Sequence, residues 1–492
     1  MKNIAKELIK IARMVKSSLA EKEVERLLKV ILQDTPWKNR VYSVGGYNRD
    51  EFLGIESKDL DIVVEMKDGA EKLTHYISKI FYPAVTNPHQ MGAGYPIWQI
   101  TFKEDITYKN ESYKTEGAII EFADTMKESF PDEMSRQRET EFGTIQDDIE
   151  RRDFTVNMLL KDLSTGELVD MTGVSKHDIE KGILRGHPKI SLDKIFNDDP
   201  LRMMRLVRFQ CKYGWRIPIS VLNTVKRNAD RIKIISAERI MGELQKIMKL
   251  GKLHQAIRLM KMTGLLQHIL PEVMELEKTE QGPQHHQEGN AFRHTMMVLK
   301  NAPPTIEGQM AALLHDIGKP ATQQAIGDEI RFHGHAETGA KIAEAILYRL
   351  KFDAKTIQTI VRLVENHMRP LTLFDASEKS LRKFLREMGD ELADTLLDLA
   401  EADARGSLPV NNRVPELKER VKRIRESPIQ VQKKPVLDGN EIMQILNVKA
   451  GPIIGKVTSF LMGLADEYAE KGKQLTKEDA EHEVILHFSK GE

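Results

Sequence analysis

The spacing of apolar residues changes near residue 192, and this change constrains the fold more than any other feature. Short β-type apolar runs, VYSV (41–44), PIWQITF (96–102) and GAIIEF (117–122), lie before it, and apolar residues at helical spacing dominate after it. Strands and helices bury different faces and therefore segregate into separate layers. We predict an α+β chain, with a small α/β head on a mixed sheet followed by an elongated all-helical body.

Composition excludes several classes of protein. The 74 basic and 74 acidic side chains among 492 residues balance, which excludes a uniformly basic nucleic-acid coat. The apolar runs fall short of the roughly 18 residues of a membrane span. Charges interrupt the surface helix expected over residues 4–15, which is therefore not a secretory signal. One cysteine, Cys211, excludes a disulfide framework. We expect a cytoplasmic protein without membrane contact, whose oligomeric state stays open.

Glycine- and proline-containing stretches mark candidate domain boundaries at 185–191, 278–290 and 405–415. They predict four domains: a head with an N-terminal helix (1–185), a neck or body (186–280), a second helical domain (281–405) and a C-terminal helical tail (406–492).

Gly45 and Gly46 follow a short predicted strand and precede Arg49 and Asp50. A glycine pair lets the backbone come close to a phosphate, where donors of the turn and a guanidinium can bind it. The turn therefore predicts a phosphate-binding site.

Asp59 and Asp61 open the next predicted strand, KDLDIVV (58–64). Side chains alternate along a strand, so both carboxylates point to one face, an arrangement that can hold Mg²⁺ against a triphosphate. Glu121, on a neighbouring strand, is the candidate third acid, which either orients a hydroxyl or completes the metal shell. Such an acid pair alone is usually solvent-facing charge, but the preceding glycine turn favours catalysis.

The motif RRDFTVN (151–157) supplies further candidates. One interpretation gives Arg152 a contact with a triphosphate or a base and lets Asp153 and Asn157 order a ribose, and the family resemblance described below favours it. The alternative is a pair of arginines in surface ion pairs, each worth about 0–1 kcal/mol.

The stretch DDPLRMMRLVRF (198–209) predicts a helix with Asp199 and Arg202 on one face. An acceptor beside a guanidinium fork can mimic a base-pairing partner, whereas the alternative is an ordinary salt bridge. The local charge favours base reading, because residues 202–233 contain nine Lys or Arg and one acid. Two more arginines would face phosphates: Arg205 and Arg208.

The helical body contains histidines and aspartates that could bind a metal. A His-Asp pair in LLHDIGKP (313–320) can hold an ion whose bound water has a pKa of about 7. A lone histidine is more often a packed or surface residue, but several in one segment reverse that expectation. The expected ligands are His294, His315, Asp316, His335, His367 and Asp403.

Together GGYNRD, DLDIVV and RRDFTVN resemble the class II CCA-adding enzyme and bacterial poly(A) polymerase family of template-independent nucleotidyltransferases. The resemblance implies that the motif of Gly45, Gly46, Arg49 and Asp50 binds the phosphates and sugar of the incoming nucleotide. It also implies that the D-x-D pair binds two catalytic metals. Asn48 departs from the usual Val, and we expect it to alter packing under the turn.

By the same resemblance, Asp199 and Arg202 belong to the motif that selects C and A, with Asp198 in place of its leading Glu. The segment from His294 to Asp403 resembles the HD superfamily of metal-dependent phosphohydrolases. Its extra histidines, His335 and His367, suggest two ions, for which Mn²⁺, Ni²⁺, Co²⁺ or Fe²⁺ suits imidazole better than Mg²⁺.

The expected function is CCA addition to the 3′ end of tRNA from CTP and ATP. The HD domain implies phosphatase and 2′,3′-cyclic phosphodiesterase activity, as in bacterial CCA-adding enzymes. Three alternatives remain: a poly(A) polymerase or partial (CC- or A-) adding enzyme, an HD phosphohydrolase with an inactive transferase head, and a catalytically silent RNA-binding module.

Overall fold

The computed structural model divides the chain into two compact units, Met1–Ser236 with Met262–His268 and Ala237–Lys261 with Ile269–Glu492. The residues that it describes are 19–56, 60–91, 95–129, 139–281, 289–326, 329–427, 429 and 431–488. The helix expected over residues 4–15 and the candidate ligand Asp59 lie outside the described residues.

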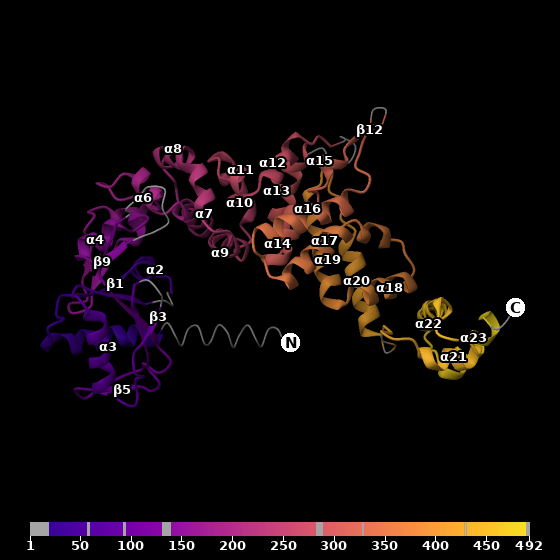
Figure 1. Cartoon of the computed structure of the whole chain (residues 1–492), viewed down its shortest axis with the longest axis horizontal. Coiled ribbons are helices and arrows are strands. Elements are labelled where there is room, and N and C mark those ends of the chain that lie inside the picture. Colours follow the sequence, from indigo (N-terminus) through magenta and orange to yellow (C-terminus); the bar gives the residue numbers. More distant parts are fainter. Residues whose placement is uncertain are drawn as a thin grey trace. The chain divides into compact units, whose positions relative to one another are not determined.

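Seven strands in the described part of the first unit form a mixed sheet in the order β11–β10–β1–β2–β7–β4–β3. These strands are β1 (Val41–Val44), β2 (Asp61–Val64), β3 (His89–Met91), β4 (Ile97–Thr101), β7 (Ile119–Asp124), β10 (Leu160–Asp162) and β11 (Leu168–Val169). Figure 1 draws this unit in indigo to magenta and labels β1 and β3. The pair β2–β7 is parallel and the other pairs are antiparallel. Two hairpins accompany the sheet: β5 (Ile106–Tyr108) with β6 (Glu111–Tyr113), and β8 (Met126–Ser129) with β9 (Glu139–Phe142).

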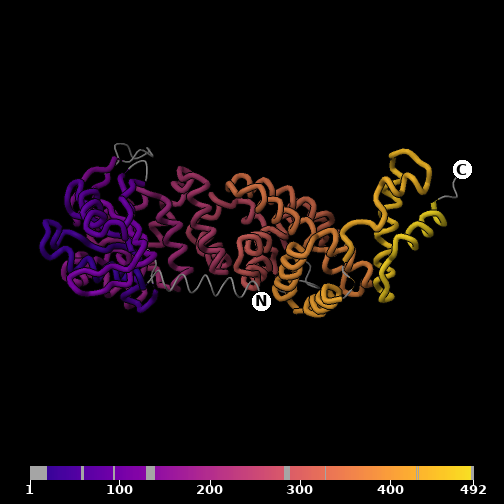
Figure 2. Tube along the Cα trace, turned by 90° about the horizontal axis from the view of Figure 1, so that it is seen from below, coloured from indigo at the N-terminus to yellow at the C-terminus, as the bar shows by residue number. Residues whose placement is uncertain are grey.

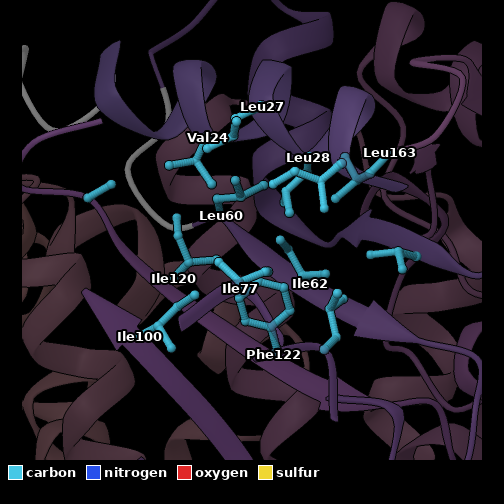
Figure 3. Close-up of a cluster of buried hydrophobic side chains, with 14 of the residues drawn as sticks. Val24, Leu27, Leu28, Leu60, Ile62, Ile77, Ile100, Ile120, Phe122 and Leu163 are labelled. Atoms are coloured by element: carbon cyan, nitrogen blue, oxygen red, sulfur yellow. The ribbon is translucent and has the colours of Figure 1, made fainter. Parts of the chain in front are cut away.

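Helices pack on this sheet through their apolar faces. Residues 19–31 form one helix and α3 (Gly69–Ile80) another. Figure 3 shows side chains from both meeting side chains of the strands in one buried cluster. Its labelled members are Val24, Leu27, Leu28, Leu60, Ile62, Ile77, Ile100, Ile120, Phe122 and Leu163. The alternating apolar residues of the predicted strands thus supply the core of the head.

Shorter helices connect and follow the strands. They are α2 (Gly46–Phe52), α4 (Ile145–Glu150), the 3₁₀ turn η2 (Thr155–Asn157), α5 (Ser175–Lys181), α6 (Leu192–Asp198), α7 (Leu201–Tyr213) and α8 (Ile219–Asn228). From α6 onward the described chain is almost entirely helical, which confirms the change of pattern expected near residue 192.

The second unit is helical apart from the hairpin of β12 (Gln324–Ile326) and β13 (Glu329–Arg331). Its principal helices are α9 (Ala237–Met248), α10 (Leu253–Met262), α13 (Ala291–Asn301), α14 (Ile306–Leu314), α16 (His335–Arg349), α17 (Ala354–Asn366), α18 (Glu378–Met388), α19 (Asp390–Gly406) and α20 (Val414–Glu426). None of the helices in the described residues combines the length and apolarity of a membrane span.

Three C-terminal helices, α21 (Gly439–Leu446), α22 (Pro452–Glu470) and α23 (Lys477–Phe488), lie together as a group (Figure 2). They share a hydrophobic cluster of their own, which includes Leu437, Val457 and Leu461.

Asn48 joins α2 to the sheet. It is fully buried, and its amide nitrogen donates to the carbonyl oxygens of Ser43 (2.7 Å) and Leu159 (2.9 Å), while its Oδ1 accepts from the Ser43 hydroxyl (2.7 Å). A buried amide with all of these partners satisfied holds the first turn of α2 in place. The change of packing expected at this position therefore takes the form of a hydrogen-bonded clamp.

Replacing Asn48 with Val should lower the free energy of unfolding by about 2 kcal/mol, because buried polar groups lose their partners. Urea unfolding of the Asn48→Val and Ser43→Ala variants is the measurement. Ser43→Ala deletes only the hydroxyl bond and should cost less than half as much. A fully stable Asn48→Val variant would show that the clamp contributes nothing.

Candidate active sites

Gly45 and Gly46 lie where β1 passes into α2, and three candidate side chains approach this glycine pair. The φ of 75° and ψ of −136° of Gly45 suit glycine. A Cβ built there would lie 3.6 Å from Nη1 of Arg152 and 3.9 Å from Oδ2 of Asp61. A Cβ at Gly46 would come 3.2 Å from Nη2 of Arg49. The glycine pair thus leaves room for two guanidinium groups and a carboxylate at one turn.

Asp61 begins β2 and is exposed, and it pairs in register with Glu121 on the parallel strand β7. Residues that face each other across neighbouring strands point their side chains to the same side of the sheet. Gln99 on β4 donates to Oε1 of Glu121 (3.1 Å) and fixes that carboxylate. The structure therefore brings together two of the three candidate acids, and the third, Asp59, lies outside the described residues.

A buried polar chain connects the glycine turn to α7. Nη1 of Arg49 donates to Oδ1 of Asn157 (2.5 Å), and Nδ2 of Asn157 donates to Oδ1 of Asp153 (2.8 Å). Oδ2 of Asp153 accepts from Nε of Arg205 (2.6 Å). Burial opposes ionisation of Asp153, but Arg205 and the Asn157 amide outweigh it and hold its pKa below the ordinary value. Four predicted site residues thus form one network.

Asp148 holds Arg152 in place. Its carboxylate is completely buried and accepts from Nε (3.1 Å) and Nη2 (2.7 Å) of Arg152 through one oxygen, and from Arg151 through the other. Burial opposes ionisation, but the two arginines hold the pKa of Asp148 below its usual value. Sequence reasoning missed Asp148, although its spacing of four residues from Arg152, with both near one helix end, was a usable signal.

The expected single helix over 198–209 is wrong. Helix α6 ends at Asp198 and α7 begins at Leu201, while Asp199 has extended backbone angles, φ −147° and ψ 98°. Pro200 is the cause, because proline has no N–H to donate and disfavours helical geometry in the residue before it. Asp199 follows the last residue of α6, and its Oδ1 accepts from the N–H of Leu201 (3.1 Å), the first residue of α7.

Arg202 is buried, with 9% of its surface exposed, and its side chain stabilises the junction between α6 and α7. Nη1 donates to the carbonyl oxygen of Ile195 (3.0 Å) and Nη2 to that of Arg151 (2.5 Å). It is thereby held beside the backbone of the RRDFTVN motif. Arg208, further along α7, lies over the ring of Phe209, 4.3 Å from its centroid.

All six candidate metal ligands of the second unit meet in two groups. His294 comes from α13, His315 and Asp316 follow α14, His335 begins α16, His367 follows α17 and Asp403 lies on α19. His294, His315 and Asp403 form one group and Asp316, His335 and His367 the other, and within each group the ligand atoms lie within 4.8 Å of one another. This donor set fits divalent transition ions.

Asp316, a member of the second group, also approaches the first group. Its Oδ2 is 3.2 Å from Nε2 of His315 and 3.7 Å from Nε2 of His294, and its Oδ1 is 3.6 Å from Nε2 of His335. One carboxylate thus faces imidazoles of both groups. Burial opposes ionisation, but His315 and Lys319 hold the pKa of Asp316 well below its usual range.

Backbone carbonyls orient three of these imidazoles. Nδ1 of His315 bonds the Ala312 oxygen (2.9 Å), and His335 and His367 bond the oxygens of Phe332 (2.8 Å) and Val364 (2.7 Å) in the same way. An Nδ1–H that donates to a carbonyl leaves Nε2 as a ligand. Burial, reinforced by His315, lowers the pKa of His367 to about 4, so its ring is neutral near pH 7.

Lys319 is the residue of this site that sequence reasoning missed. It is 6% exposed, and its Nζ is 2.7 Å from Oδ2 of Asp316 and 2.5 Å from Oε1 of Gln281. The neighbouring Gly318 permits this packing, because a Cβ there would lie 2.1 Å from the carbonyl oxygen of His335. The Gly318-Lys319 pair, which closely follows His315 and Asp316 in the sequence, could have identified this lysine.

Three segments match described families. Residues 41–185 match the poly A polymerase head domain, residues 214–276 the probable RNA- and SrmB-binding site of polymerase A, and residues 294–405 the HD domain.

Relatives of known name cover most of the chain. A CC-adding tRNA nucleotidyltransferase of Thermus thermophilus is 30% identical over 351 residues, 69% of this chain and 76% of the relative. An A-adding tRNA nucleotidyltransferase of Deinococcus radiodurans is 31% identical over 332 residues, 64% of this chain and 73% of the relative. A multifunctional CCA protein of Acinetobacter baumannii is 26% identical over 391 residues, 76% of this chain and 86% of the relative.

Solved structures share the fold. The CCA-adding enzyme of Bacillus stearothermophilus in complex with CTP has a TM-score of 0.63 at 20% identity, covering 91% of this chain and 92% of its own. The Thermotoga maritima CCA-adding enzyme in complex with tRNA has a TM-score of 0.57 at 19% identity, covering 94% of each chain. The resemblance seen in the motifs is thus confirmed, and the chain belongs to the tRNA nucleotidyltransferase and poly(A) polymerase family, with an HD domain in its second unit.

Proposed function

We propose that the protein adds C, C and A in turn to the 3′ end of tRNA, using CTP and ATP without a nucleic-acid template. The observation that carries this proposal is the convergence of Arg152 and Asp61 on Gly45, with Glu121 in register beside Asp61. The relatives named as tRNA nucleotidyltransferases support the choice of substrate. We propose four domains, residues 1–185, 186–280, 281–405 and 406–492. We also propose that the enzyme is cytoplasmic.

In the proposed reaction the terminal 3′-oxygen of tRNA attacks the α-phosphorus and pyrophosphate leaves. Asp61, with Asp59, would hold divalent cations, and we assign Mg²⁺ because these ligands are all oxygens. When bound, such ions supply positive charge to the triphosphate and acidify the attacking hydroxyl. Glu121 orients that hydroxyl, and Arg152, fixed by Asp148, faces the triphosphate oxygens at the glycine turn.

Base selection is proposed for Asp199 and Arg202. Two N–H groups of Arg202 are used on backbone carbonyls, which fixes the direction of its remaining donors. Because one of those carbonyls belongs to Arg151, the guanidinium lies next to the backbone that presents Arg152 to the phosphates. Asp199 supplies the acceptor from its extended position before α7. Arg205, which is held by Asp153, and Arg208 are proposed to bind phosphates.

For the HD site we propose phosphatase and 2′,3′-cyclic phosphodiesterase activity. The two ligand groups, both of which Asp316 faces, support two transition ions there, Mn²⁺, Ni²⁺, Co²⁺ or Fe²⁺. When bound, these ions supply a nucleophilic water at neutral pH. Lys319 is proposed to keep Asp316 ionised and oriented.

A partial activity is the second candidate, since the relatives with about 30% identity include a CC-adding and an A-adding enzyme. Transcripts of tRNA that end at the position before CCA, after C or after CC separate the possibilities when each is incubated with one labelled nucleotide. Full CCA addition predicts two C residues on the first transcript with CTP and one A on the third with ATP. Addition of C alone or of A alone would identify a partial enzyme, and a run of A on every transcript a poly(A) polymerase.

Asp61→Asn should lower the rate of nucleotide addition at least about 100-fold, because a charge that stabilises the transition state is lost. Thermal stability should change little, since Asp61 is exposed at the end of its strand. Single-turnover extension of tRNA is the measurement, and Asp68→Asn, another exposed acid of the head, is the control. Addition at the wild-type rate by Asp61→Asn would remove Asp61 from the catalytic set.

His315→Ala should abolish hydrolysis of a 2′,3′-cyclic nucleotide in Mn²⁺, Ni²⁺ or Co²⁺ and leave nucleotide addition in Mg²⁺ nearly intact, because the two sites use separate ligands. The matched control is His333→Ala, which changes an exposed histidine outside both ligand groups. Both activities are assayed on each variant with each metal. Parallel loss of nucleotide addition in folded His315→Ala would show that the sites are coupled.

A further inference from the structure

Two stacked aromatic rings lie at the end of α7, one on its last residue, Tyr213, and one on Trp215 just beyond it. The rings of Tyr213 and Trp215 have centroids 4.4 Å apart and an angle of 19° between their planes. Trp215 also lies against the backbone of Gly182, where a Cβ would come 2.6 Å from its Cδ1. Gly182 has a φ of 60° and ends α5, so the stack is supported by backbone that admits no larger residue.

Tyr213 joins this stack to the glycine turn in two ways. The guanidinium of Arg49 lies over its ring, with the central carbon 4.8 Å from the centroid. Its hydroxyl donates to Oδ1 of Asp50 (2.9 Å), and the same oxygen accepts from Nε of Arg49 (2.8 Å). Arg49 in turn lies against Gly46. One side chain from α7 therefore contacts both members of the Arg49–Asp50 pair.

The phenol of Tyr213 is suited to donating a hydrogen bond to Asp50. Burial, opposed in part by Arg49 and assisted by Asp50, raises the pKa of Tyr213 above its ordinary value. The hydroxyl therefore stays protonated at physiological pH and remains a donor to the carboxylate. Asp50 is also buried, and Nζ of Lys212 is 3.9 Å from its other oxygen.

We propose that Tyr213 is a positioning residue that holds the Arg49–Asp50 pair against Gly46 and thereby sets the affinity of the head for its incoming nucleotide. This inference rests on the proposed nucleotidyltransferase function. Loss of the hydroxyl would leave Arg49 as the main donor to Oδ1 of Asp50, so that the pair could turn away from the glycine turn. The effect falls on nucleotide binding, because Tyr213 contacts Arg49 and Asp50, the pair that lies at the glycine turn.

The test is Tyr213→Phe, which removes the hydroxyl and keeps the ring. The KM for CTP and for ATP should rise about tenfold, the effect of losing a hydrogen bond to a charged group, whereas kcat should stay within about twofold. Tyr113→Phe is the matched control, because its buried hydroxyl also donates to a carboxylate, Glu111 (3.0 Å), on the separate β5–β6 hairpin. Calorimetric binding of CTP to the full-length protein measures affinity without tRNA.

The possible results test the positioning role of Tyr213 and the proposed function separately. An unchanged KM and CTP affinity in Tyr213→Phe, or a fall in kcat alone, overturns the positioning role. The same loss of affinity in Tyr113→Phe also overturns it, because the effect would then be general to the fold. If the wild type binds CTP but does not extend tRNA, the proposed function fails while the binding comparison still tests Tyr213. Absence of any CTP or ATP binding by the wild type overturns both.

Discussion

The candidate site of the head depends on buried carboxylates that are paired with arginines. An isolated charge loses its hydration on burial, so Asp148 and Asp153 remain ionised in the interior only because guanidinium groups surround them. The requirement acts in both directions, because each arginine is fixed by the carboxylate that it neutralises. Arg152 is thereby presented at Gly45, and Arg205 ties α7 to the RRDFTVN motif.

The same principle organises the second unit around Asp316. This carboxylate belongs to the second ligand group and faces four imidazoles and a buried lysine. Backbone carbonyls at the ends of helices and turns set the orientation of the rings, so the ligand geometry is built into the fold. The candidate metal ligands of the head are all oxygens, whereas those of the second unit are mostly imidazole nitrogens, so the two sites are chemically distinct.

Two positions show how a single residue can change the backbone conformation or the packing around it. Pro200 divides a stretch whose arginine spacing otherwise suggests one continuous helix, and the division places Asp199 in extended backbone. Asn48 stands where an apolar residue is usual in the resembling family, and it is tolerated in the core because three hydrogen bonds satisfy its amide. In both cases the outcome depends on backbone hydrogen bonding, which apolar periodicity does not describe.

The sequence by itself determined the sheet-then-helix order, the glycine turn, the acid on β2 and the six histidines and aspartates that the structure gathers into two groups. These features depend on local periodicity or on residue types that serve few other purposes, such as a glycine pair or a His-Asp pair. Only the tertiary structure decided which distant groups meet. Tyr213 and Asp50 are 163 residues apart and Arg205 and Asp153 are 52 apart, and no local pattern encodes either contact. Lys319 and Asp148 each had a local signal in the sequence, but only the packed chain shows that they are buried beside other charges.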